Sequence, residues 1–442
     1  MEPIIKIDQG IKVLIIGAGA AGIGAARRLL EFGIKPIILE GRDRGGGRCY
    51  TSNFKGIPID LGAAWVHSIN PENSIYNEIK RMGYPLKEEK TAEAYLDEDK
   101  GLLENSISVK QGTHWNILQK KQIKAEDCSL FELIKEDLEE VKRNQSEIEN
   151  RVLDVLITRK EQYYGDCINV LSSHYYEYVI EPECESENIV PSGGYGALLA
   201  KLSEGLEIKY NQNVTKIQYK TKEVSVYMEE GGKFDGDLAI VTLPLGVLKN
   251  NSVIFDPALP QEKIEAIGRL GNGLANKIFL KFKNNFWGDN LKYFRIASEE
   301  KERFTCFYCW DNKENVLCSF VNGPFARKIE KMSDLEIIQL IMEHLKRTFK
   351  KTEEIELEDY LITRWGQDKW CLGSYSFFKY GSTPKDCDNL KKEVLGTIFF
   401  AGEACFKENI GVCHGAYKTG VEAANKIIEI LKTDYEKRKE FN

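Results

Sequence analysis

Residues 13–40 constrain the fold most, because they contain a complete pattern of strand, glycine turn, helix and strand. A short apolar run rich in β-branched residues ends at Ile16. Three glycines follow with the spacing G-x-G-x-x-G, namely Gly17, Gly19 and Gly22. Apolar residues at helical spacing then continue to Phe32, and a second apolar run ends at Glu40. The pattern predicts a βαβ unit with parallel strands and the glycine turn at the start of its helix.

This unit indicates a dinucleotide site. A glycine turn at the positive end of a helix lets a pyrophosphate approach the backbone N–H groups. Glu40 ends the second strand, where a carboxylate accepts hydrogen bonds from both ribose hydroxyls. Its charge disfavours a 2′-phosphate, so a phosphorylated nicotinamide cofactor is not expected. A simple tight turn is the alternative interpretation of the glycines alone.

A second glycine cluster follows directly and carries more information. Arg42, Arg44 and Arg48 surround the glycines at 45–47. A guanidinium there holds phosphate oxygens in a bidentate way, and the glycines let the backbone come close. A nicotinamide dehydrogenase has no need of this second loop, so the cluster favours a buried flavin dinucleotide over an exchanging nicotinamide.

Composition excludes several classes of protein. The chain has 442 residues and a net charge of -7, which argues against nucleic acid as a partner, since phosphate binding needs a basic face. The 11 cysteines never form paired CxxC ligands, so no metal is expected, and reduced thiols indicate a reducing compartment. No secretory signal is visible and the longest apolar run is too short to span a bilayer. We therefore expect a soluble cytoplasmic protein with no membrane partner.

Several motifs occur in a fixed order along nearly the whole chain. They are "EGRDRGGGR" at 40–48, with Gly41 in place of the usual alanine, "DLGAAWVHS" at 60–68, "GGYGAL", "TLPLGVLK", "GLANKIFLKFKNNFW", "RWGQDKWCLGSYS" and "FFAGEACFKENIGVCHGAYKTGVEAA". In these motifs the sequence closely resembles the flavin-dependent amine oxidases, in particular their polyamine oxidase and lysine-demethylase branches. The resemblance implies an enzyme that binds FAD, passes a hydride equivalent from a C–N bond to the flavin, and reduces O2 to hydrogen peroxide.

The resemblance also implies which residues contact FAD. They are Gly17, Gly19, Ala21, Gly22, Glu40, Arg42, Gly47, Arg48, Ala64, Trp65, Val214, Glu403, Val412 and Cys413. Monoamine oxidases attach FAD through a cysteine just before the first tyrosine of their substrate cage. Ser374 stands at that position and Cys371 has the wrong offset, so we expect the FAD to be non-covalent.

The family pattern assigns a catalytic role to Lys277, which matches the lysine that holds a water against the flavin N5. On pattern alone, a lysine in the alternating stretch "NKIFLKF" is a solvated strand residue. The substrate-binding residues implied are His67 and Tyr375. Trp365 and Trp370 lie in the same motif as Tyr375, and for Trp370 core packing is an equally good interpretation. Val412 stands where monoamine oxidases have the second cage tyrosine.

The predicted fold class is α/β (α+β), with a Rossmann-like FAD-binding domain interleaved with a mixed-sheet and helical substrate-binding domain. The FAD-binding domain is assigned to residues 1–80, 188–270 and 387–442. The substrate-binding domain takes residues 81–187, expected to be largely helical, and 271–386. An acidic run at 177–187 could steer a cationic substrate, although such runs are usually solvated loops.

The leading functional prediction is an FAD-dependent polyamine oxidase that oxidises a secondary or primary amine of a small-molecule polyamine. Demethylation of N-methyl-lysine in a protein tail is the alternative, but we see no added N-terminal module and no long paired-helix insertion in the second half. A third possibility is a catalytically silent structural flavoprotein, against which the intact Lys277 argues. The polyamine used, the carbon oxidised and the oligomeric state stay open.

Overall fold

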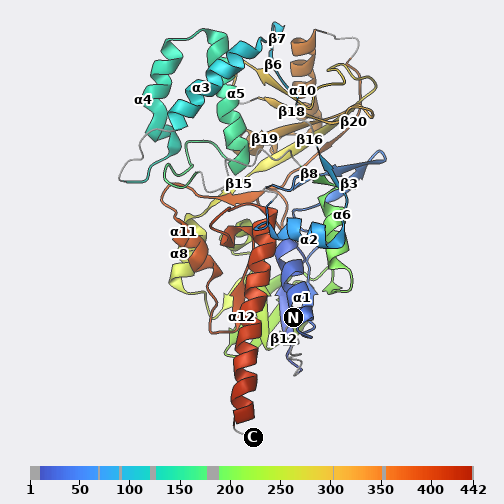
Figure 1. The fold of residues 1–442 in the computed structure, drawn as a ribbon, viewed down its shortest axis with the longest axis vertical. Helices are drawn as coiled ribbons and strands as arrows, with labels where there is room; N and C mark the ends of the chain where they lie inside the picture. Colours follow the sequence, from blue (N-terminus) through green and yellow to red (C-terminus); the bar gives the residue numbers. More distant parts are fainter. Residues whose placement is uncertain are drawn as a thin grey trace.

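The computed structural model describes residues 10–67, 70–88, 92–119, 126–176, 189–301, 303–350 and 355–440. The acidic run at 177–187 lies outside these described residues. The molecule is elongated, with a parallel sheet and the long last helix in one half and a larger mixed sheet with most of the remaining helices in the other (Figure 1).

A five-stranded parallel sheet forms the centre of the first half. Its strands, in spatial order, are β22 (Ile398–Phe400), β13 (Leu238–Val241), β1 (Val13–Ile16), β2 (Ile37–Leu39) and β9 (Glu207–Lys209). The predicted βαβ unit is present, since Leu14 pairs with Ile37 in parallel and α1 (Ala20–Glu31) connects the two strands. Alanines and branched residues of α1 pack with α12 (Cys413–Glu440) and with alternate strand residues in one apolar cluster. The parallel sheet is thus built from segments far apart in the sequence.

Shorter elements surround this sheet. A four-stranded sheet contains β12 (Lys233–Gly236), β11 (Glu223–Met228), β10 (Val214–Lys220) and β14 (Ile254–Asp256). Two-stranded sheets are formed by β3 (Thr51–Phe54) with β4 (Ile57–Asp60), and by β5 (Leu86–Glu88) with β8 (Ile189–Pro191). The helices of this half are α2 (Ser74–Met82), α6 (Tyr195–Ser203), α7 (Leu245–Lys249), α8 (Gln261–Arg269) and α11 (Pro384–Lys391).

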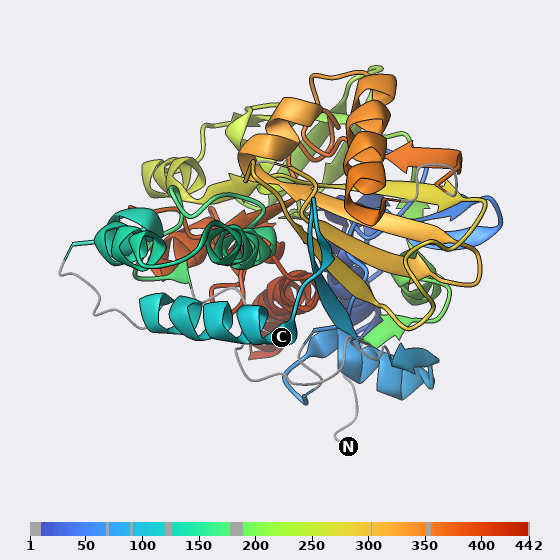
Figure 2. The ribbon, with the colours of Figure 1, turned by 90° about the horizontal axis from the view of Figure 1, so that it is seen from above.

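The second half contains a seven-stranded mixed sheet. In spatial order its strands are β20 (Leu357–Ile362), β16 (Ala275–Phe282), β19 (Val316–Asn322), β18 (Cys306–Asp311), β17 (Tyr293–Ala297), β6 (Glu93–Asp97) and β7 (Gly101–Leu102). The helices α3 (Asn105–Gln119), α4 (Leu130–Arg143) and α5 (Glu147–Tyr164) lie together on one side, and α9 (Gly323–Ile329) and α10 (Asp334–Phe349) lie on another (Figure 2). Between the halves, β15 (Gly271–Gly273) pairs with β21 (Tyr375–Phe377).

Residues 81–187 contain a strand of the large sheet besides the expected helices. In this range, β6 joins the seven-stranded sheet by pairing in parallel with β17, from Glu93 opposite Tyr293 to Asp97 opposite Ala297. A strand whose partner lies about two hundred residues later in the chain has no local sequence signal beyond its own short apolar run. Both strands fall within the proposed substrate-binding domain, whereas the pairing of β5 with β8 crosses its boundary.

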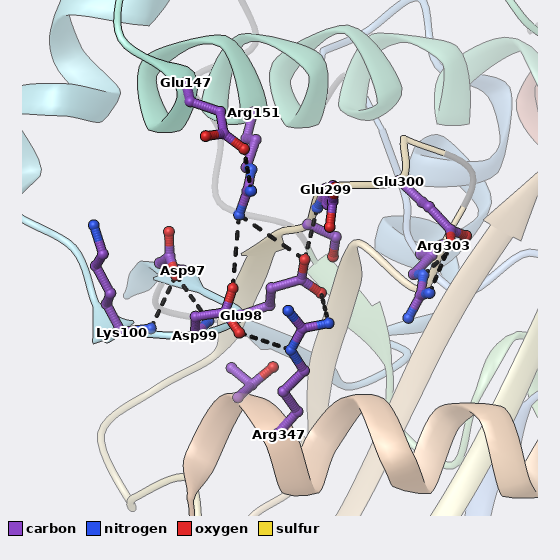
Figure 3. A network of polar contacts seen from close by, with 12 residues as sticks. Asp97, Glu98, Asp99, Lys100, Glu147, Arg151, Glu299, Glu300, Arg303 and Arg347 are labelled. Carbon is purple, nitrogen blue, oxygen red and sulfur yellow. Dashed lines mark hydrogen bonds and ion pairs between the residues drawn. The ribbon is translucent and has the colours of Figure 1, made fainter.

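A buried carboxylate ties this strand to two helices. Glu98, between β6 and β7, is 1% exposed. It accepts a hydrogen bond of 2.7 Å from the backbone N–H of Glu299. Arg151 of α5 and Arg347 of α10 place guanidinium nitrogens 3.9 and 3.7 Å from its oxygens (Figure 3). Capping boxes at Ser146 and Ser333 fix the starts of the same two helices.

Among the described residues, no helix is long and apolar enough to cross a membrane. The same residues contain no group of three or more His, Cys, Asp or Glu side chains that could hold a metal ion.

Candidate active site

The first glycine turn is tightly packed at Gly17 and Gly22 and open at Gly19. A Cβ at Gly17 would lie 2.6 Å from Thr242 Oγ1, and one at Gly22 would lie 2.0 Å from the Gly17 carbonyl oxygen. At Gly19 a Cβ would meet nothing within 4 Å. Gly19 is also the N-cap of α1, and no side chain caps the helix there. The first N–H groups of α1 therefore face open space, which is the arrangement that a phosphate binds.

Glu40 is held in a fixed orientation at the end of β2. Its two carboxylate oxygens accept backbone hydrogen bonds, one of 2.8 Å from Ala18 and one of 2.9 Å from Arg42. The residue is 6% exposed. Each carboxylate oxygen has a second lone pair, so Glu40 can accept further hydrogen bonds from a ligand hydroxyl.

The three arginines of the second cluster have different partners. Arg44 donates to the carbonyls of Gly45 and Gly47 at 3.1 and 3.0 Å, so it holds the second glycine loop together. Arg42 makes a bidentate pair with Asp368 at 2.8 and 2.7 Å. A Cβ at Gly47 would lie 3.6 Å from Gly19 Cα, which brings the two glycine loops side by side.

Arg48 joins the second loop to the short 3-10 helix η2 (Glu403–Cys405). It donates to Glu403 and to the carbonyl of Ser374, in both cases at 2.9 Å. The backbone N–H and hydroxyl of Ser376 also donate to Glu403, at 3.2 and 3.0 Å. Arg48 and Glu403, which are 355 positions apart, therefore form one polar cluster, as the FAD assignment requires.

Lys277 points from β16 toward the loop that follows β4. Its Nζ donates to the carbonyls of Asp60 and Gly62, at 2.7 Å in each case, and lies 5.3 Å from the Trp65 ring centroid. An ammonium has three donors, and the described residues provide no third acceptor for this one. Burial lowers the pKa of Lys277, although Cys318 and Asp60 act in the opposite direction.

Aromatic side chains enclose this lysine. Trp310 and Phe320 have ring centroids 5.4 and 5.5 Å from Nζ, and both pack against Trp65. Ring faces attract a cation, and the rings also exclude water from it. Trp310 and Phe320 were missed from the sequence, because nothing local in β18 or β19 shows that they face β16.

The two predicted substrate residues both have shifted pKa values. His67 is exposed, and yet burial lowers its pKa. Tyr375 is half-buried, and burial raises its pKa. The Tyr375 hydroxyl donates to the carbonyl of Gln162 in α5, which fixes the ring between the two halves.

The two tryptophans of the Tyr375 motif lie elsewhere. Trp365 is 7% exposed and donates from Nε1 to the Leu61 carbonyl at 3.0 Å. Trp370 lies against Gly41, where a Cβ would be 2.4 Å from its Nε1. Its Nε1 donates to Asn213 at 3.1 Å, and the Arg42 guanidinium stacks over its ring at 4.9 Å. Trp370 therefore belongs to the Glu40–Arg42 end of the site.

The remaining predicted contacts lie in α1, in the loop after β4, at the start of β10 and at the start of α12. Ala21 and Ala64 are buried, and Trp65 is half-buried. Val214 opens β10 next to Asn213. Val412 precedes α12, and Cys413 is its first residue. Asp368 was not predicted, although it lies in a quoted motif, because its partner Arg42 is 326 positions away.

A family model now explains this arrangement. The model of flavin containing amine oxidoreductases matches residues 20–428, which include α1, the second glycine loop, Lys277 and the start of α12. The chain belongs to this family.

Relatives in this flavin amine oxidoreductase family have two kinds of name. A protein of Oryza sativa subsp. japonica, lysine-specific histone demethylase 1 homolog 2, is 33% identical over 96% of this chain and 58% of its own length. Polyamine oxidase 5 of the same organism is 32% identical over 95% of this chain and 88% of its own length. Lysine-specific histone demethylase 2 of Homo sapiens is 30% identical, and this chain spans 53% of it.

A solved structure has the same fold. A double mutant of putrescine oxidase, redesigned for cofactor binding, superposes with a TM-score of 0.75 at 19% sequence identity and covers 95% of this chain and 99% of its own. The α/β fold predicted from the sequence is therefore the fold of a flavin amine oxidase.

The residues present suit a flavin dinucleotide. The uncapped start of α1 and the open space beside Gly19 suit a pyrophosphate. Glu40 offers an oriented acceptor for ribose hydroxyls, and Arg42 and Arg48 supply positive charge nearby.

Proposed function

We propose that this chain is an FAD-dependent amine oxidase of the polyamine oxidase type, which oxidises a secondary or primary amine of a polyamine to an imine while O2 is reduced to hydrogen peroxide. The observation that carries the proposal is Lys277, which is buried in an aromatic enclosure and held by two backbone carbonyls with a third N–H to offer. A merely structural lysine is seldom placed at such a desolvation cost.

The proposed FAD contacts are those of the sequence prediction: Gly17, Gly19, Ala21, Gly22, Glu40, Arg42, Gly47, Arg48, Ala64, Trp65, Val214, Glu403, Val412 and Cys413. A bound FAD supplies a two-electron acceptor for the amine. We propose that it is non-covalent, because the Ser374 hydroxyl is engaged with the carbonyl of Ala275 at 2.8 Å and offers no thiol.

In this proposal Lys277 positions a water molecule with its third N–H. The low pKa that burial gives Lys277 also eases loss of a proton from Nζ. We propose that His67 and Tyr375 contact the amine. Burial lowers the pKa of His67, which favours its neutral form and weakens repulsion of a cationic substrate.

Two further parts of the prediction stay proposals. The division into an FAD-binding domain of residues 1–80, 188–270 and 387–442 and a substrate-binding domain of the remainder is compatible with the separate sheets, except where β5 pairs with β8. The ten described cysteines are free thiols, which supports a reducing compartment such as the cytoplasm.

A substrate panel tests the proposal. Purified holoprotein is mixed with spermine, spermidine, their acetylated forms and a methyl-lysine peptide, and peroxide release is measured. We expect turnover of at least one polyamine and none of the peptide. Turnover of the peptide alone would favour the demethylase alternative, which the 33% identical relative supports. A yellow protein that oxidises none of them would favour the silent flavoprotein.

Lys277→Met tests the residue that carries the proposal. We expect flavin reduction by the amine, or flavin reoxidation by O2, to slow by about a hundredfold or more, as loss of a group that assists proton transfer does. Lys281→Met is the matched control, because Lys281 lies on the same strand and donates to the surface carbonyl of Glu314. Equal kinetics in both variants would remove the role assigned to Lys277.

A further inference from the structure

Two cysteines meet at the junction of the second glycine loop and the last helix. The sulfur atoms of Cys49 and Cys413 are 3.4 Å apart, although 364 positions separate the residues in the chain. Cys49 directly follows Arg48, and Cys413 directly follows Val412. Of the cysteines that the structure describes, no other two have their sulfurs within hydrogen-bonding distance of each other.

The surroundings make Cys413 the more nucleophilic of the two. It is the first residue of α12, so the positive end of a long helix lies beneath its sulfur. Hydrogen bonds from the Cys49 thiol and the Tyr195 hydroxyl, together with the charge of Arg48, lower the pKa of Cys413 against the effect of burial. The same contact raises the pKa of Cys49. Cys413 is thus the better nucleophile, and Cys49 donates a hydrogen bond to its sulfur.

The two sulfurs need to move only a short way to be joined. A disulfide needs its sulfurs at about 2.05 Å, and here they are 3.4 Å apart. Cys413 is partly exposed and Cys49 is 7% exposed, so the Cys413 sulfur is the more accessible of the two to a small oxidant.

We propose that Cys49 and Cys413 form an oxidisable dithiol that hydrogen peroxide converts to a disulfide. The inference rests on the proposed function only for the source of the peroxide, which is the product of the amine oxidase.

The chemistry balances. The Cys413 thiolate attacks one peroxide oxygen, the O–O bond breaks, and the leaving hydroxide takes a proton to become water. The Cys49 sulfur then attacks the sulfenic sulfur of Cys413, the S–O bond breaks, and the hydroxyl leaves with the Cys49 thiol proton as a second water molecule. Two thiols and one peroxide thus give one disulfide and two waters.

The consequence concerns the proposed flavin site. The disulfide would link the residue after Arg48 to the residue after Val412, both of which are proposed FAD contacts. The cross-link would restrain the separation of these two segments, and we expect it to retain the flavin for that reason. The oxidase would then hold its cofactor more firmly as peroxide accumulates.

The test uses the holoprotein with added hydrogen peroxide and no amine. After alkylation of free thiols and digestion without reductant, we expect a peptide pair joined through Cys49 and Cys413, lighter by two hydrogens than the two thiol peptides together. The denatured protein should show two titratable thiols fewer than its original 11. Cys49→Ser should give no cross-linked pair and a sulfenic acid on Cys413 that a dimedone probe traps.

Cys128→Ser is the matched control, because Cys128 is also partly exposed and its sulfur has a polar contact with Ser173, at 3.6 Å, and no cysteine partner among the described residues. This variant should form the same cross-link. The inference would be overturned if the natural protein gave no joined peptides at a peroxide concentration that already oxidises its Cys128. Flavin release in urea, followed by the rise in flavin fluorescence, should be slower from oxidised than from reduced holoprotein. In Cys49→Ser, oxidation should leave the rate of release unchanged. Equal release from oxidised and reduced protein would overturn the retention effect.

A second arm separates this inference from the proposed function. Each polyamine of the substrate panel replaces peroxide in turn, with and without catalase. If added peroxide forms the disulfide and none of the polyamines releases peroxide, the dithiol stands and polyamine oxidation fails. If a polyamine releases peroxide but neither treatment forms the disulfide, the function stands and the dithiol fails.

Discussion

At the scale of single residues, Gly41 and Trp370 show how one departure from a family pattern is compensated elsewhere. The space that an alanine Cβ would take at 41 is filled by the Trp370 indole, whose Nε1 would be 2.4 Å away. The indole is held there by Asn213 and by the Arg42 guanidinium. Position 41 therefore requires glycine because Trp370 occupies the space of a side chain, and not because of the backbone conformation.

This contact yields a prediction about stability. Gly41→Ala should force the indole away and break its bond to Asn213, which lowers the free energy of unfolding by about 1–3 kcal/mol. Urea unfolding measures the change. Gly268→Ala in α8 is the control, because a Cβ there meets nothing within 4 Å, so it should be neutral or slightly stabilising. In the Trp370→Ala background the Gly41→Ala effect should disappear, and an undiminished effect would contradict the steric explanation.

At the scale of elements, the packing of α10 against β6 buries a histidine beside a carboxylate. His344 Nδ1 lies 3.8 Å from Glu98 Oε2, and both side chains are 1% exposed. Burial, followed by the charges of Arg303 and Arg347, lowers the pKa of His344 from 6.5 to about 4. The unfolded chain therefore takes up a proton near pH 6.5 that the folded chain takes up only near pH 4.

The sign of the resulting pH dependence follows from this difference. The stabilisation is complete above pH 6.5 and falls as the pH drops toward 4, by up to about 3 kcal/mol. His344→Asn should remove this part of the slope, which urea unfolding between pH about 7 and about 4.5 measures. His114→Asn on α3 should keep the slope of the natural protein. If stability depends on pH equally in His344→Asn and in the natural protein, His344 takes up its proton at the same pH in the folded and the unfolded chain.

The elements also show what a sequence can predict here. The β1–α1–β2 unit was predicted because strand, turn and helix are contiguous and have a clear period. The strand β6 was missed because its neighbour β17 is remote in the chain, and Trp370 could not be placed because its partner is Gly41. Lys277 was found only through the motifs that flank it, since its own strand pattern favours a solvated lysine. Residues whose role depends on distant partners, such as Asp368, carry no local signal.

At the scale of the whole molecule, polar contacts around the candidate site join the two halves. Lys277 reaches the loop after β4, Trp365 reaches Leu61, and Arg42 reaches Asp368. Each contact connects the range 40–62 with the range 271–386. The residues of the site therefore also hold the two halves of the molecule together, and ligand binding should be coupled to global stability.

Asp368→Asn tests this coupling. Arg42 is 8% exposed, and without Asp368 its charge lacks its bidentate partner, so the apoprotein should lose on the order of 2 kcal/mol. If Arg42 faces the flavin phosphates as proposed, their negative charge replaces the lost carboxylate. The rise in melting temperature on adding FAD should then be larger in Asp368→Asn than in the natural protein. Asp388→Asn, which removes only the surface pair with Lys407, should leave that rise unchanged. An equal rise in melting temperature in all three proteins would place Arg42 away from the phosphates. If the phosphates compensated the Arg42 charge, FAD would bind the Asp368→Asn variant with a different energy.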